Sequence, residues 1–214
     1  GLMLLFLGRP CAALMGGLTV WLAGMADSSC IVSVGVILGL MMCFDLGGPI
    51  NKVAYAFATA GLAAATSDNP TPYLIMGAVM AAGMVPPLAM ALASTILGRG
   101  LFTPVERENG KAAWLLGASF ISEGAIPFAA GDPFRVIPAS LVGGAVTGAL
   151  SMVFGVQSLA PHGGFFVAFA INPVWGFVVS ILAGTVVSAL LVVALKKFVG
   201  VRSNVDVEEA AVAA

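Results

Sequence analysis

The sequence predicts an all-α membrane protein, a polytopic helical bundle that includes re-entrant hairpins. The first observation behind this prediction is composition: 60% of the 214 residues are hydrophobic, 9% are charged and the mean hydropathy is +1.07. A soluble domain carries about 25% charged residues, so a water-soluble fold is excluded. The second observation is that long apolar runs separate the few charges. At about 20 residues per crossing, the chain has room for about six to eight membrane elements.

Charged residues delimit the predicted elements, because an unpaired charge inside a bilayer costs at least a few kcal/mol. The charge-free runs 10–26, 28–44, 53–67 and 69–98 each predict one crossing. The run 136–195 is long enough to cross, turn and cross again. Its turn is expected around Gln157 to Gly164, where Pro161-His162-Gly163-Gly164 cannot continue a helix. The spacings Gly35/Gly39 and Gly144/Gly148 would let helices approach closely.

The distribution of Lys and Arg predicts the orientation in the membrane. The hydrophilic segment Arg99 to Lys111 and the C-terminal end both carry cations, so both are expected in the cytoplasm. The turn Thr66 to Pro72 has no Lys or Arg and is expected outside. Counting crossings then places Arg9 and Lys52 inside and Asp27 outside.

The apolar segment between Lys111 and Arg135 differs from the others, because it begins and ends beside a cation. With both ends in the cytoplasm, it is predicted to be a re-entrant hairpin and not a crossing. Such a broken backbone is tolerated only where protein or a watery cavity shelters it.

Three polar segments interrupt the apolar sequence and are the candidate functional elements. The first is Asp45 to Lys52 (DLGGPINK), where a broken helix beside Asn51 would offer hydrogen bonds to a polyhydroxylated ligand. The alternative is a loop in which Asp45 and Lys52 pair with each other. The second polar segment is Ile121 to Phe128, which contains Glu123 between Ser122 and Gly124.

Glu123 is the strongest functional signal in the chain, because a carboxylate inside an apolar segment is costly. It is expected to accept a bond from a ligand hydroxyl, to carry a proton, or to form half of a buried ion pair. The third segment, Ala160 to Phe165, carries His162, the only histidine. Its alternative reading is an incidental polar loop. Three broken elements predict one shared site, and acceptors with few cations favour a neutral polyol or sugar over an anion.

Other classes of chemistry find little support in the sequence. The net charge of −1 leaves no basic face for nucleic acid. The cysteines Cys11, Cys30 and Cys43 form no CxxC or Cys/His pattern, so neither a metal site nor a cofactor is predicted.

Four strings carry a resemblance to a known family: MMCFDLGGPINKVAYAF (41–57), MAAGMVPPLAMALA (80–93), FISEGAIPFAAGDPFRVIPA (120–139) and APHGGFFV (160–167). They resemble the membrane IIC domain of the fructose-type permeases of the bacterial phosphoenolpyruvate-dependent sugar phosphotransferase system. The resemblance covers about residues 10–197. It implies that 1–197 is a partial IIC translocation domain, the last two thirds, lacking early helices, and that 198–214 is a flexible tail.

The resemblance implies a multi-pass protein of the bacterial inner membrane with a cytoplasmic C-terminus. Fructose or a related hexose would be carried inward and phosphorylated by a phosphocysteine on a IIB domain, supplied in turn by IIA and the phosphocarrier protein. The full-length protein would be a homodimer in the lipid bilayer. None of the three cysteines lies in a IIB-like context, so the phosphoryl donor is expected on another domain or chain.

The resemblance also implies roles for individual residues. The catalytic roles fall on Glu123 and His162. The expected substrate-binding residues are Asp45, Gly48, Asn51, Ser122, Gly124, Pro161 and Gly163, and Lys52 and Arg135 are expected to dock the phosphorylated partner or to screen charge. Two alternatives stay open: an ion- or proton-coupled secondary transporter that leaves a neutral polar solute unmodified, and a purely structural membrane subunit.

Overall fold

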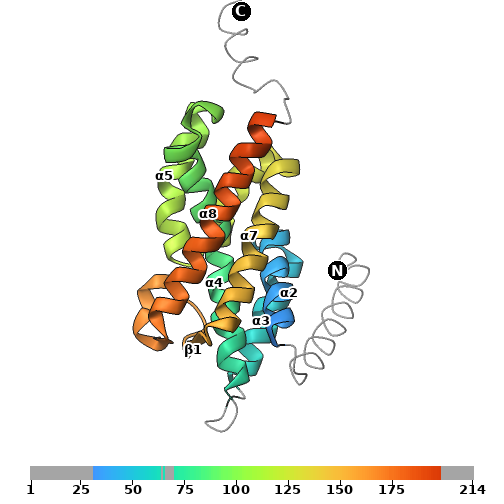
Figure 1. Cartoon of the computed structure of the whole chain (residues 1–214), viewed down its shortest axis with the longest axis vertical. Coiled ribbons are helices and arrows are strands. Elements are labelled where there is room, and N and C mark those ends of the chain that lie inside the picture. Colours follow the sequence, from blue (N-terminus) through green and yellow to red (C-terminus); the bar gives the residue numbers. More distant parts are fainter. Residues whose placement is uncertain (1–30, 64, 66–69, 199–214) are drawn as a thin grey trace, which may run out of the picture.

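The computed structural model describes residues 31–63, 65 and 70–198, and these confirm an all-α fold (Figure 1). The α-helices are α2 (Ile31–Phe44), α3 (Pro49–Ala63), α4 (Thr71–Leu92), α5 (Pro104–Ala118), α6 (Ile126–Gly131), α7 (Pro133–Val153) and α8 (Val174–Phe198). Shorter helical turns occupy Ala93–Leu97, Arg99–Leu101, Ser122–Ala125 and Gly164–Ala170, and the two-residue strands β1 (Gln157–Ser158) and β2 (Ile171–Asn172) pair antiparallel. The predicted crossing 10–26, residues Arg9, Asp27 and Asp68, and the tail after Phe198 lie outside the described residues.

Three helices are long and apolar enough to cross a membrane, and they match three predicted crossings. Within the described residues they are Thr71–Leu97, Pro133–Val153 and Val174–Phe198. The first, α4 with its π-helical continuation, lies at the centre of the bundle, where 89% of its most apolar window is buried. The predicted turn between the other two is confirmed, and it runs on through β2 to Pro173 before α8 begins.

Glycines allow α2 and α7 to pack with their backbones in contact. A Cβ at Gly39 would overlap the carbonyl oxygen of Gly144, and one at Gly35 would overlap that of Gly148. The two predicted glycine spacings therefore face each other, one on each helix. The same contacts show that the two helices run in opposite directions.

The segment Pro104 to Asp132 folds back on itself, as predicted for a re-entrant hairpin. Its first turn is closed by a capping box between Thr103 and Glu106. Lys196 Nζ, near the end of α8, lies 3.7 Å from Glu106 Oε1 and 3.6 Å from Asp132 Oδ2. One cation thus contacts both ends of the segment. We call this end of the bundle, which carries Arg99, Arg107, Lys111, Lys196 and Lys197, the basic end; in Figure 1 it is at the top.

The crossings predicted for 28–44 and 53–67 are wrong. The end of α2 lies beside the middle of α7, since the Sγ of Cys43 faces Gly144. The helix α3 has only 15 residues, about 22 Å, and its Gly61 faces Pro72 at the start of α4. The pair α2–α3 therefore forms a second hairpin that enters from the opposite end (Figure 1).

Lys52 consequently lies in the first turn of α3, at the tip of this hairpin, and not in a loop between two crossings. The physical reason is the helix break before it, where Leu46 and Gly47 have φ values of 49° and 105°. The side chain of Leu46 is buried in the same cluster as Ala125 and Phe128 of the other hairpin. The tips of the two hairpins therefore meet within the bundle.

Candidate functional site

A small pocket lies where the two hairpin tips meet the loop between α7 and α8. Its volume is about 90 Å³. Residues from all three predicted polar segments line it. The complete lining is Met42, Asn51, Lys52, Tyr55, Phe120, Ile121, Ser122, Glu123 and His162. The predicted convergence of three broken elements on one site is thus present in the fold.

Glu123 and Lys52 form an ion pair across the two hairpins. Lys52 Nζ lies 3.1 Å from Glu123 Oε1, and the side chains are 57% and 45% exposed, respectively. Lys52 does not pair with Asp45, whereas Glu123 forms half of an ion pair, as one of the alternatives expected, but that pair is half exposed and not buried. A half-exposed pair that lines a pocket can be reached by a ligand.

Backbone contacts explain why Glu123 faces this pocket. A Cβ at Gly47 would lie 2.5 Å from Glu123 Oε1, and the φ of 105° at this position is one that glycine adopts readily and other residues rarely adopt. Residues Ser122–Ala125 form a single 3-10 turn before α6 begins. The break in the re-entrant segment thereby presents the carboxylate at its tip.

His162 is held by two aromatic rings that also line the pocket. Its imidazole lies 5.1 Å from the Phe120 ring and 6.2 Å from the Tyr55 ring, centroid to centroid. The Tyr55 contact is edge-to-face, a favoured arrangement of aromatic rings. The backbone beside His162 is tied to the hairpin as well, because a Cβ at Gly164 would overlap the carbonyl oxygen of Ala118.

Phe120 adopts a backbone conformation that is strained for a bulky residue. Its φ is +64°, in the left-handed region that non-glycine residues seldom occupy. Residues held in this region tend to cluster at functional sites. Here the strain turns the chain at the hairpin tip and sends the Phe120 ring against His162.

Ser122 and Asn51 fasten the two tips to the scaffold. The Ser122 hydroxyl donates to the carbonyl oxygen of Gly83 at 2.8 Å, and Asn51 Nδ2 donates to that of Met42 at 2.6 Å. Both residues are 4% exposed. Because the Ser122 hydroxyl already donates its hydrogen to the backbone, it can only accept a hydrogen bond from a ligand.

Other predicted site residues lie outside the pocket lining. The Asp45 carboxylate accepts backbone bonds from Ile50 (2.7 Å) and Asn51 (2.9 Å), so it caps α3. Arg135 pairs with Asp132 at 2.7 Å, in the cluster with Lys196 at the basic end. The remaining predicted residues absent from the lining are Gly48, Gly124, Pro161 and Gly163.

Four lining residues were not predicted from the sequence: Met42, Tyr55, Phe120 and Ile121. A signal for one of them was present, because Tyr55 follows Asn51 and Lys52 by four and three residues and so shares their helix face. Among residues 31–63, 65 and 70–198, no group of three or more His, Cys, Asp or Glu side chains is placed to hold a metal ion.

Comparisons with known proteins find relatives along nearly the whole chain. The chain is 52% identical over 198 residues to the PTS system fructose-specific EIIB'BC component of Escherichia coli K12, covering 91% of this chain and 34% of the relative. It is 45% identical to the fructose permease IIC component of Bacillus amyloliquefaciens (92% of this chain, 62% of the relative) and 46% identical to the PTS system fructose-specific EIIC component of Haloferax volcanii (91% and 50%).

The chain thus spans about a third of the multidomain relatives and about half to three fifths of the IIC components. No family model matches it. No solved structure matches it either.

Proposed function

The chain belongs to the family of fructose-specific IIC membrane components of the phosphotransferase system, and from this premise we propose that it carries a fructose-type hexose across the bacterial inner membrane while the sugar is phosphorylated. The phosphoryl donor is a phosphocysteine of a IIB domain, on the same chain or a separate one, which IIA and the phosphocarrier protein recharge. The observation that supports this most directly is the pocket at which Lys52, Glu123 and His162 converge from three broken elements.

The chemistry of the pocket suits a neutral sugar. A hexose offers several hydroxyls, each of which must find a partner when it leaves water. The pocket supplies carboxylate and hydroxyl acceptors in Glu123 and Ser122, an ammonium donor in Lys52 and an imidazole in His162. Its volume of about 90 Å³ is below the roughly 300 Å³ at which ligand pockets begin, so binding requires the hairpin tips to separate.

We assign the role of general base to Glu123. A sugar hydroxyl is a weak nucleophile, and a carboxylate within hydrogen-bond reach can orient it and take its proton. The S–P bond of the donor breaks as the O–P bond of the sugar phosphate forms, the cysteine leaves as thiolate, and the hydroxyl proton passes to Glu123. Lys52 engages Oε1, which leaves Oε2 to meet the hydroxyl.

The neighbouring residues act on charge and orientation. Lys52 is assigned to screening of the negative charge on the phosphoryl group as it approaches the carboxylate. His162, held between Tyr55 and Phe120, is assigned to holding a sugar hydroxyl through a ring nitrogen. The product carries a phosphate, which a pocket made for a neutral sugar binds poorly, and transport is thereby coupled to phosphorylation.

A phosphorylation assay tests this function against its main rival. Glu123 and His162 share one pocket, which is also the arrangement that a proton-coupled transporter would need. Membranes carrying the full protein with its donor domain are expected to convert radiolabelled fructose to a sugar phosphate only when phosphoenolpyruvate and the phosphocarrier proteins are present. A protonophore should leave the reaction intact. Unmodified sugar inside vesicles, lost on adding protonophore, would establish the rival instead.

The orientation follows from the clustering of cations at the basic end, which we place in the cytoplasm together with the C-terminal end of α8. In whole cells, a cysteine at Leu159, which is 60% exposed in the loop at the opposite end, is expected to react with a membrane-impermeant thiol reagent. A cysteine at Asn109, near the start of α5, is expected to react only after the cells are opened. Labelling in the reverse order would invert the proposed orientation.

A further inference from the structure

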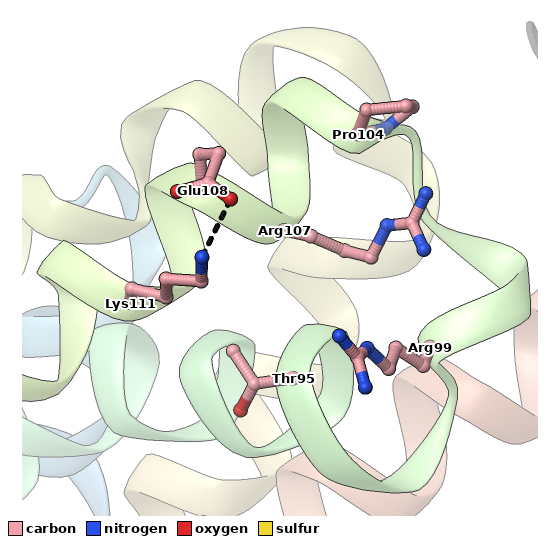
Figure 2. Close-up of a pocket in the computed structure, with 6 residues that line it drawn as sticks. All are labelled: Thr95, Arg99, Pro104, Arg107, Glu108 and Lys111. Atoms are coloured by element: carbon pink, nitrogen blue, oxygen red, sulfur yellow. Dashed lines mark hydrogen bonds and ion pairs between the residues drawn. The ribbon is translucent and has the colours of Figure 1, made fainter.

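A second pocket, larger than the first, opens at the basic end between the end of α4 and the start of α5. Its volume is about 440 Å³, and its lining is Thr95, Arg99, Pro104, Arg107, Glu108 and Lys111 (Figure 2). It shares no residue with the pocket around Glu123. Its position and chemistry have no part in the proposed sugar chemistry.

The charges in this pocket favour an anion. Three cations line it against a single carboxylate, and that carboxylate, Glu108, pairs with Lys111 at 2.6 Å. Figure 2 shows the guanidinium groups of Arg99 and Arg107 reaching into the space from two different segments. Within the described part of the chain, neither guanidinium has an acidic partner. Two arginine forks on one cavity match the oxygens of a phosphate group.

The surface beside the cations is apolar, which distinguishes this pocket from a simple anion site. Ile96 is 64% exposed directly after Thr95, and Leu115 is 64% exposed one turn beyond Lys111. The indole Nε1 of Trp114, the residue before Leu115, donates to Thr95 Oγ1 at 3.3 Å. The same face therefore changes from cationic to aromatic to aliphatic within about two helical turns, which is the order of a membrane interface.

From this arrangement we propose that the pocket binds the headgroup of an anionic phospholipid. The phosphate lies between Arg99 and Arg107, Lys111 stands at its edge, and the acyl chains follow the exposed side chains of Ile96 and Leu115. Basic pockets between membrane helices are suited to such headgroups. An acidic or phosphorylated protein would contact the same cations, but it would not need the exposed aliphatic side chains of Ile96 and Leu115 beside them.

The test uses the full-length protein purified in a neutral detergent and titrated with dioleoylphosphatidylglycerol, with dioleoylphosphatidylcholine as the neutral reference and native mass spectrometry as the readout. Wild type is expected to prefer phosphatidylglycerol. Arg107→Gln and Arg99→Gln should each weaken its binding about tenfold, the scale of one charge-assisted bond. Arg107→Lys, which keeps the charge and loses the fork, should fall between wild type and Arg107→Gln.

The matched control is Lys197→Gln, which removes one positive charge from the same end outside the pocket. It should leave binding within about twofold of wild type.

Equal losses in Lys197→Gln and Arg107→Gln would overturn the proposal, because binding would then follow overall charge. Displacement of the lipid by equimolar inorganic phosphate would also overturn it, as would arginine variants that lose affinity for the phosphorylated IIB domain while retaining phosphatidylglycerol. Sugar phosphorylation serves as an independent check that each variant is folded.

Discussion

Glu123→Gln is expected to lower the phosphorylation of fructose by at least about a hundredfold, with the protein still folded. The substitution keeps the shape of the side chain and removes its ability to take a proton. General-base catalysis contributes a factor of about 10² to 10⁴ to the rate. It also removes the charge that pairs with Lys52 at 3.1 Å. Because that pair is half exposed, its loss should affect stability little. The measurement is formation of radiolabelled sugar phosphate by membranes with matched amounts of protein.

Asp132→Asn provides the matched control. Asp132 is another carboxylate of the same hairpin, but it lies at the basic end with Arg135 and Lys196 and is not part of the pocket lining. Its loss should change turnover per folded protein by less than about twofold, since a salt-bridged carboxylate far from the site acts on stability. Unchanged turnover in Glu123→Gln would reject the general base while leaving the phosphotransferase function standing. A purely structural subunit would give a different result, because wild-type protein would then also form no sugar phosphate.

Gly39→Ala is expected to destabilise the folded protein by about 3 kcal/mol, the upper part of the range for overpacking. The added methyl would overlap the carbonyl oxygen of Gly144 on α7, and a backbone atom in the middle of a packed helix cannot move aside as a side chain can. The helices α2 and α7 would have to separate, which would also displace the hairpin tip that carries Lys52. Thermal melting of the purified protein in detergent measures the loss.

Gly100→Ala adds the same methyl where no atom lies within 4 Å, so its melting temperature should match that of wild type. The pair of variants separates the effect of close helix packing from the general cost of replacing a glycine. A Gly39→Ala protein as stable as Gly100→Ala would contradict the backbone contact between α2 and α7.

The re-entrant hairpin was predictable because its signal is local. Cations flank the segment from Lys111 to Arg135, and broken-helix residues occupy its centre, so its return to one side follows from charge alone. The hairpin α2–α3 carried no comparable signal. Its two apolar stretches have the composition of crossings, and Lys52 between them resembled a loop cation. Hydropathy reports the composition of a segment. It does not show whether the chain turns back before it has crossed the bundle.

The site was predictable in its residue types and less so in its partners. Asn51, Ser122, Glu123 and His162 stood out because polar groups in an apolar sequence need a reason. Asp45 stood out for the same cause, yet its carboxylate is used within its own turn to cap α3. A sequence cannot distinguish an acceptor committed to the backbone from one that faces a ligand, because both occur beside helix breaks.

By itself, the sequence determined that the chain is a membrane protein, that three of its apolar runs form helices long enough to cross, and where the three polar breaks with the candidate functional side chains lie, since each of these depends on composition within a single segment. Only the tertiary structure decided that Lys52 pairs with Glu123, 71 residues away, and that Tyr55 and Phe120 hold His162. Those contacts depend on backbones that approach across glycines in separate helices. That approach is a property of the packed bundle, and no segment of the chain contains it alone.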